Sequence, residues 1–134
     1  MGLFRRALTA YFHAIYRDMV DRRLRAQVDI MEPCGAGLHL DLGSHAGENA
    51  VRLAAAGGLA PTWGLDYDLD LLRTGLQQQR VRGIQANLNQ PLPLRSAAFD
   101  VVTAMDVIEH LSGVDTFVGE IYRVLKPGGY AVIA

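Results

Sequence analysis

The chain has 134 residues, of which 50% are apolar and 20% charged, and its 13 basic and 14 acidic side chains give a formal net charge of -1. This length predicts one domain with a substantial core, and the near-neutral charge does not favour nucleic acid as a partner. The single cysteine, Cys34, excludes an internal disulfide and a multi-cysteine zinc site. Because there is neither a long apolar run nor a signal-peptide core, we expect a cytoplasmic protein without stable membrane insertion.

The first 34 residues are predicted to form a helix, over residues 3–30, and a linker around Cys34. Apolar side chains recur at spacings of three and four, which places them on one helical face: Phe4, Leu8, Tyr11, Phe12, Ile15 and Met19. Six arginines and three aspartates leave residues 3–30 with a charge of +3. We interpret this amphipathic helix as a packing helix or lid, because its acids are interspersed among its bases. The alternative is a helix that lies on a membrane surface or docks a partner.

Residues 35–134 are predicted to alternate strands with helices. The expected strands cover residues 38–42, 62–66, 81–87, 99–104 and 130–134, and the expected helices cover residues 48–56, 69–79 and 115–125. Asp68 is a candidate N-cap, and the glycines at 57 and 58 end the first of these helices. This alternation implies parallel strands joined by right-handed crossovers, and therefore a Rossmann-like, doubly wound α/β sheet.

The loop after the first strand is the strongest functional signal. Ligands bind at the carboxyl ends of such strands, where Gly43 and Gly47 allow a tight turn and a helix begins with free amide donors. Asp41 can accept a hydrogen bond from a cationic amine, and Asp66 at the end of the second strand can bind both hydroxyls of a ribose. Tyr67 offers a flat face on which adenine can stack. Together these residues predict a nucleoside ligand that carries an amino acid.

Other nucleotide ligands fit this loop less well. A dinucleotide fingerprint needs three glycines spaced as G-x-G-x-x-G, whereas this loop has only Gly43 and Gly47 and no Walker pattern. The carboxylate of Asp41 would also repel a pyrophosphate. NAD and nucleoside triphosphates are therefore disfavoured.

From about residue 38 to its end, the sequence contains ordered segments that read DLGSHAG, GLD, NLNQPLP, FDVV, DVIEHL and RVLKPGG. In this order they resemble the motifs of the class I S-adenosylmethionine-dependent methyltransferases, in particular the small-molecule branch of ubiquinone-pathway and methionine-pathway-like enzymes. It implies strand order 3-2-1-4-5 and S-adenosyl-L-methionine as cofactor. It also implies that the chain is truncated within the fifth strand, without the final helix and two strands of the family.

The resemblance implies cofactor-binding roles for Asp41 and Gly43 at the methionine end, for Asp66 at the ribose and for Tyr67 and Asn87 at adenine. It further implies contacts from Ser44, Gly47, Leu88 and Met105. Two positions depart from the family pattern. Asn87 replaces an aspartate, although its carbonyl can still accept a hydrogen bond. His45 replaces a glycine, and its side chain is interpreted either as turned to solvent or as a functional imidazole.

Methyl transfer needs a base only where the acceptor must lose a proton, because the donor is already activated. The candidates are Asp106, Glu109 and His110, whose spacing predicts one side of a helical turn after the fourth strand. In some relatives a similar cluster resembles a divalent-metal site, but three ligands are too few to predict a metal here. The alternative is that these residues brace the loop under the cofactor.

The sequence thus predicts methyl transfer to a small-molecule or carrier-linked acceptor. The alternative hypothesis is a non-catalytic remnant of the methyltransferase fold that serves as a binding or assembly module. The apolar edge over residues 131–134 predicts pairing with another copy of the chain, because an unpaired strand edge is a template for association.

Overall fold

The computed structural model describes the backbone of residues 2–31 and 37–134, and side chains within residues 11–23, 25–31 and 37–134. The predicted linker around Cys34 and the side chains of Phe4 and Leu8 lie outside these described residues. No helix in the described part of the chain combines the length and the apolar character that crossing a membrane requires.

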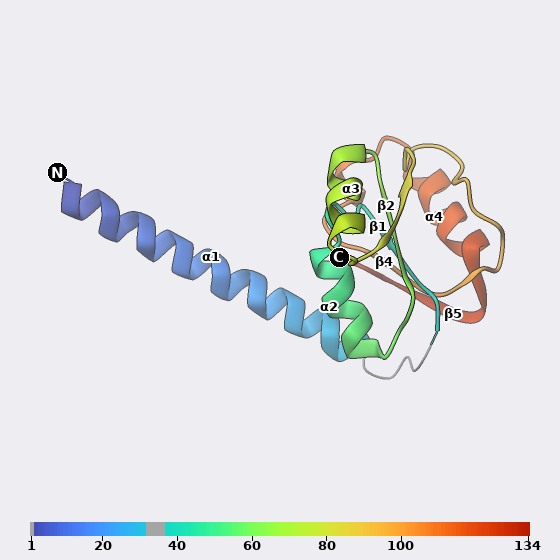
Figure 1. Cartoon of the computed structure of the whole chain (residues 1–134), viewed down its shortest axis with the longest axis horizontal. Coiled ribbons are helices and arrows are strands. Elements are labelled where there is room, and N and C mark those ends of the chain that lie inside the picture. The colour runs from blue at the N-terminus through green and yellow to red at the C-terminus, as the bar shows by residue number, and fades with distance from the viewer. Residues whose placement is uncertain (1, 32–36) are drawn as a thin grey trace.

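Five parallel strands form one sheet in the order β3-β2-β1-β4-β5, which confirms the predicted doubly wound topology. The strands are β1 (His39–Leu42), β2 (Thr62–Asp66), β3 (Arg82–Gln85), β4 (Phe99–Ala104) and β5 (Leu125–Ile133). The helices are α1 (Gly2–Met31), α2 (Glu48–Gly57), α3 (Leu69–Gln77) and α4 (Val114–Val124), with a 3-10 turn, η2 (Ile108–His110). Helices α2 and α3 lie on one face of the sheet and α4 lies on the other (Figure 1).

The alternation of side chains along the strands divides the core between the two faces of the sheet. Leu40 and Leu42 of β1 are fully buried toward α4, where they share a cluster with Phe117. A second cluster on the opposite face joins Met31 of α1 and Leu53 of α2. Strand β1 is buried over its whole length, as expected for a central strand of a parallel sheet covered on both faces.

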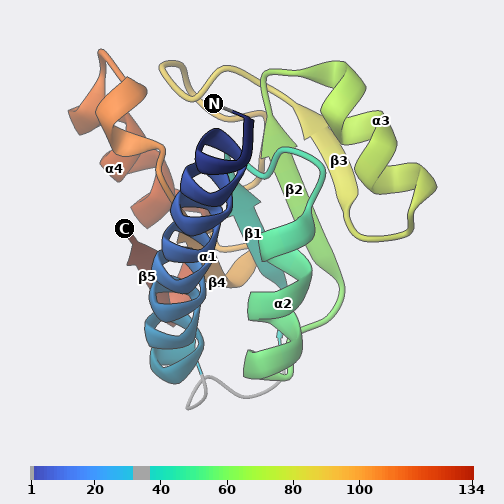
Figure 2. The ribbon, with the colours of Figure 1, turned by 90° about the vertical axis from the view of Figure 1, so that its left-hand side faces the viewer.

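The prediction that the apolar face of α1 packs against the domain is wrong within this chain, because the described side chains of that face are exposed. Tyr11 and Phe12 are 61% and 58% exposed, and the helix leaves the body of the domain (Figures 1 and 2). Among the described side chains of α1, those of residues 11–23 are exposed, and the buried ones are Gln27 and Met31. At about 100° per residue, the apolar stripe lies about a third of a turn round the helix from the buried side. The stripe therefore does not follow the side of α1 that meets the domain.

Strand β5 starts earlier than predicted, at Leu125 instead of residue 130. Leu125 adopts an extended backbone directly after α4 and pairs with Phe99, whereas the next pair along β4 joins Val101 to Tyr130. The intervening residues form an irregularity within the strand. Among the described residues β5 pairs only with β4, and its pairing with another copy stays a prediction.

Three glycines fix the distance between β2, α3 and the loop after β1, because they surround the side chain of Val81. A Cβ at Gly47 would lie 2.7 Å from Val81 Cγ1, and one at Gly64 or Gly75 would lie 3.0 Å from Val81 Cγ2. Gly64 also leaves room for the Ser44 hydroxyl, which would be 2.6 Å from its added Cβ. Close packing of these elements therefore depends on the absence of side chains at these positions.

We predict that Gly64→Ala destabilises the protein by about 1–3 kcal/mol, because the new methyl group overpacks against Ser44 and Val81. Gly119→Ala is the matched control, since an added Cβ at this position in α4 meets nothing within 4 Å. It should stabilise the protein by about 0.5–1 kcal/mol through helix propensity. Urea denaturation measures both, and equal effects of the two substitutions would contradict the packing described.

Candidate functional site

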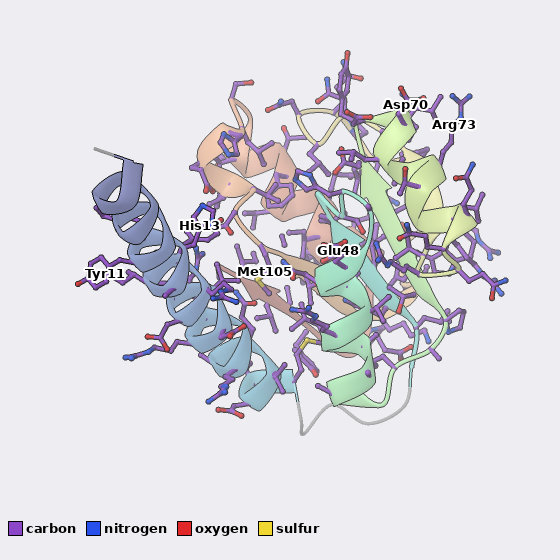
Figure 3. All side chains as sticks on the ribbon, turned by 60° about the vertical axis from the view of Figure 1, so that its left-hand side comes forward. Tyr11, His13, Glu48, Asp70, Arg73 and Met105 are labelled. Atoms are coloured by element: carbon purple, nitrogen blue, oxygen red, sulfur yellow. The ribbon has the colours of Figure 1, made fainter. Side chains whose placement is uncertain are left out.

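A pocket of about 470 Å³ opens beyond the carboxyl ends of β1 and β4. It is lined by Asp41, Gly43, Ser44, His45, Ala46, Glu48, Asn49, Leu71, Met105 and Asp106. The crossovers on either side of β1 run in opposite directions, so this is the position at which doubly wound sheets bind ligands. In Figure 3, Met105 lies between α1 and α2, and Glu48 lies at the start of α2.

A cavity of about 530 Å³ lies at the opposite end of the sheet, beside Leu38, Trp63 and Phe99. Trp63 and Phe99 stand at the amino ends of β2 and β4, and Leu38 directly precedes β1. Position in the fold and the buried carboxylate of Asp41 therefore favour the pocket beyond β1 and β4 as the functional site.

The loop after β1 is held in shape by backbone contacts with β2. The amides of Gly43 and Ser44 both donate to the carbonyl oxygen of Leu65, at 2.8 and 3.1 Å. Gly43 has φ 72°, and a Cβ there would lie 2.5 Å from Val107 Cγ2, so glycine is required on both counts. Gly47 is the N-cap of α2, also in the left-handed region, and does not line the pocket.

His45 occupies a backbone conformation that favours glycine, with φ 49°. Its amide donates to Asp66 Oδ2 at 2.8 Å, and its side chain is exposed at the edge of the pocket. Both interpretations of the imidazole therefore stay predictions. The loop carries the strain of a non-glycine residue in this conformation.

Asp66 joins the loops that follow β1 and β2. One oxygen of its carboxylate accepts from the His45 amide, and the other accepts from the Asp68 amide at 2.9 Å. Asp68 in turn accepts from the amides of Asp70 and Leu71, which confirms its prediction as the N-cap of α3. Asp66 does not line the pocket directly and lies beside the loop that does.

The carboxylate of Asp41 is the most unusual group of the site, because it is only 4% exposed. Burial raises its pKa to about 6, although a hydrogen bond donated by the Thr103 hydroxyl opposes that rise. Thr103 contacts His39 as well, with His39 Nε2 2.8 Å from Thr103 Oγ1. Burial lowers the pKa of His39 to about 4, so this imidazole is neutral at pH 7.

The sequence predicted no role at the site for Thr103 or His39. Only one ring nitrogen of His39 has a partner, since Nδ1 is buried without one among the described residues. The signal for Thr103 was present in the predicted topology. Strands 1 and 4 are neighbours in the order 3-2-1-4-5, and the register pairs Asp41 with Thr103.

Of the acidic and histidine candidates after β4, Asp106 alone lines the pocket. Asp106 lines the pocket and forms an ion pair with Arg23 of α1, whose Nη2 lies 2.5 Å from Asp106 Oδ1. Glu109 and His110 are exposed on η2 and do not line the pocket. Within the described part of the chain, no group of three or more histidine, cysteine or acidic side chains is placed to hold a metal ion.

The predicted adenine-side residues lie outside the lining of the pocket. Tyr67 is 75% exposed, and Asn87 Oδ1 accepts a hydrogen bond from the Asn89 amide at 2.9 Å. Leu88 packs against the core cluster on the α4 face. Glu48, Asn49, Ala46 and Leu71, by contrast, line the pocket without having been predicted.

The family described as "Methyltransferase domain" matches residues 40–133, which is most of the chain. The chain belongs to this methyltransferase domain family. Among curated proteins, it is 31% identical to the demethylmenaquinone methyltransferase of Streptomyces avermitilis, over 94% of this chain and 53% of that protein. It is 27% identical to the ubiquinone/menaquinone biosynthesis C-methyltransferase UbiE of Rhizobium meliloti, over 94% of this chain and 50% of that protein. This methyltransferase-family chain thus spans about half the length of these curated relatives.

Solved structures have the same fold as this methyltransferase-family domain. The YcgJ protein of Bacillus subtilis superposes with a TM-score of 0.73 at 25% identity, over 84% of this chain and 50% of that one. An S-adenosylmethionine-dependent methyltransferase from Mesorhizobium loti superposes with a TM-score of 0.69 at 22% identity, over 79% and 50%. The [4+2]-cyclase SpnF is also similar, with a TM-score of 0.67 at 26% identity, over 79% and 42%.

We predict that Asp41 and His39 give the protein opposite dependences of stability on pH. The folded state binds a proton at Asp41 more readily than the unfolded chain does, with a pKa of about 6 against 3.8, so this residue lowers stability as pH rises from about 4 to about 6. His39 binds a proton less readily when folded, with a pKa of about 4 against 6.5, so it raises stability over the range from about 4 to about 6.5. In the intact protein these two contributions oppose each other.

Single substitutions separate the two contributions. As the pH rises from 4 to 6.5, the free energy of unfolding of Asp41→Asn should increase by on the order of 2–3 kcal/mol, because only the His39 contribution remains. Over the same pH rise, the free energy of unfolding of His39→Gln should decrease by a similar amount. Urea denaturation at several pH values measures both profiles. Asp70→Asn, an exposed substitution on α3, is the control (Figure 3). Parallel profiles for the two buried variants would contradict this prediction.

Proposed function

We propose that this domain binds S-adenosyl-L-methionine in the pocket beyond β1 and β4 and supports methyl transfer to a small-molecule acceptor. The observation that carries the proposal is a buried carboxylate, Asp41, at the switch-point pocket of a chain that belongs to the methyltransferase domain family. Its neighbours in the loop supply the tight turn that a bound ligand needs.

The residues of the pocket fit the chemistry of this cofactor. The volume of about 470 Å³ lies within the usual range for small-molecule sites. Asp41 supplies an acceptor for the ammonium group of the methionine end. Ser44 Oγ, buried without a well-aligned hydrogen-bond partner among the described residues, can accept a hydrogen bond from the same end of a ligand. The oxygens of Asp66 each keep a second lone pair with which they can accept from ribose hydroxyls.

When bound, the cofactor supplies an activated methyl group on a sulfonium sulfur. The task of the chain is then to orient the two reactants and exclude water. Asp41 would anchor the methionine end, and Met105 would line the side of the pocket that faces the acceptor. Asp106 lies at the same side with its carboxylate paired to Arg23, so it would act as a base only after release from this arginine.

For the acceptor we propose a ring carbon of a quinone-type molecule. This proposal is supported by the names of the curated relatives, which are a demethylmenaquinone methyltransferase and a ubiquinone/menaquinone biosynthesis C-methyltransferase. The acceptor would enter beside Met105 and Asp106, where Val20, Arg23 and Gln27 of α1 line a small adjoining cavity.

The second candidate function is a non-catalytic binding or assembly module. It is favoured by Asp66, whose two oxygens are both engaged by backbone amides, and by the exposure of Tyr67. The presence of a cyclase among the structural neighbours is also consistent with other uses of this fold.

Titration calorimetry with S-adenosyl-L-methionine and its demethylated product tests the proposed function. We expect saturable binding that Asp66→Ala weakens at least about tenfold, because it removes the ribose acceptor and the support of the His45 loop. The control is Asp70→Ala, which removes an exposed carboxylate whose ion pair among the described residues is with Arg73, and it should not change binding. The absence of binding by the folded protein would refute the cofactor proposal. Binding without turnover of a quinone acceptor would favour the module.

A further inference from the structure

A chain of three buried polar side chains runs along the face of the sheet covered by α2. His39 and Asp41 of β1 and Thr103 of β4 project from this face, opposite to the leucines of β1 that pack toward α4. His39 and Thr103 have no exposed surface, and Asp41 alone of the three lines the pocket. The polar chain therefore leads from the interior of the domain to the candidate site.

The number of hydrogens available fixes the direction of the hydrogen bonds. An ionised Asp41 can only accept, so the single hydroxyl hydrogen of Thr103 must point at Asp41 Oδ1. Thr103 Oγ1 can then only accept from His39 Nε2, 2.8 Å away. His39 is thus assigned the tautomer with its proton on Nε2, which leaves Nδ1 as a bare acceptor.

The environment of Nδ1 makes the reverse direction costly. If Asp41 were protonated and donated to Thr103, the hydroxyl of Thr103 would donate to His39 Nε2, and the imidazole proton would move to Nδ1. Nδ1 is buried without a partner among the described residues, so the reversed chain would bury an unsatisfied N–H donor. The orphan nitrogen therefore favours the direction that stabilises the ionised carboxylate.

We propose that Thr103 and His39 are positioning residues that keep the Asp41 carboxylate ionised and oriented for the ammonium group of an amino-acid-bearing ligand. The identity of that ligand rests on the proposed function, whereas the direction of the hydrogen bonds rests on the three side chains themselves. Neither residue touches the pocket, so each acts through Asp41.

Other groups also face Asp41. The hydroxyl of Ser44 and the imidazole of His45, both in the loop after β1, favour the ionised form, whereas the carboxylate of Asp66 at the end of β2 opposes it. None of these groups changes when Thr103 or His39 is substituted. Substitutions at the two buried positions therefore isolate the contribution of the polar chain.

The first measurement is a pH titration of the Asp41 carboxyl carbon by NMR in the ligand-free protein, assigned by comparison with Asp41→Asn. Thr103→Val removes the hydroxyl and keeps the shape, and it should raise the pKa of Asp41 by about one pH unit. Thr103→Ser restores the donor and should return the pKa to the wild-type value. His39→Leu should raise the pKa of Asp41 by a smaller amount than Thr103→Val does. His39→Gln keeps a donor toward Thr103 and should leave the pKa of Asp41 unchanged.

The second measurement is binding of S-adenosylhomocysteine, the demethylated product, at pH 6 and pH 8. With the pKa of Asp41 raised by one pH unit, Thr103→Val should weaken binding about fivefold at pH 6 and hardly at all at pH 8. The matched probe is 5′-methylthioadenosine, which keeps the nucleoside and lacks the ammonium group. Its binding should be the same in both proteins at both pH values.

The two measurements separate failure of the positioning role from failure of the proposed function. An unchanged Asp41 titration in Thr103→Val, or an equal change in Thr103→Ser, would overturn the positioning role even if the product binds. If the titration moves as expected but no wild-type binding is found at either pH, the proposed function and the ligand assigned to Asp41 are overturned. Thermal unfolding confirms that each variant is folded.

Discussion

Burial of one carboxylate is the constraint on which the rest of the site depends. Asp41 continues a central strand whose neighbouring leucines have no exposed surface, so its charge stands where the sheet excludes water. Burial disfavours the ionised form and raises the pKa of Asp41 to about 6. Such a charge persists only where nearby donors or a bound cation compensate it. Thr103 is the donor that the fold supplies, and in the proposed function the ammonium group of the ligand would supply the cation.

The polar chain replaces apolar contacts with hydrogen bonds on one half of the sheet. The α4 face is filled by leucines, valines and Phe117, whereas the α2 face places His39 and Thr103 at its centre. A well-packed apolar pair would be at least as stable there, since buried polar groups recover little more than their desolvation cost. The arrangement is therefore better explained by what it does for Asp41 than by stability alone.

Much of the fold follows from local patterns in the sequence. The alternation of strands and helices predicts the order of the sheet, and the Asp68 N-cap and the glycines of the first loop are local signals that the structure bears out. Contacts between elements that are distant in the sequence are harder to predict from it. The packing of Gly47, Gly64 and Gly75 around Val81 joins four segments, and no periodicity within any one of them reveals it. The packing expected for the apolar face of α1 was wrong for the same reason, because an apolar stripe does not say which side of a helix meets its domain. The alternative, a helix that docks a partner or a membrane surface, stays a prediction.

The two halves of the pocket differ in how firmly the core positions them. The donor side is built on β1, on a loop bonded to Leu65 and on a strand register that brings Thr103 beside Asp41. At the other side, α1 lines the small adjoining cavity, and its contact with Asp106 is an exposed ion pair of the kind that contributes little to stability. Helix α1 is held to the core further along its length, where Met31 is fully buried in the cluster on the α2 face. The core therefore fixes the group that would hold the cofactor in the proposed function, whereas the cavity beside Arg23 depends on an exposed ion pair.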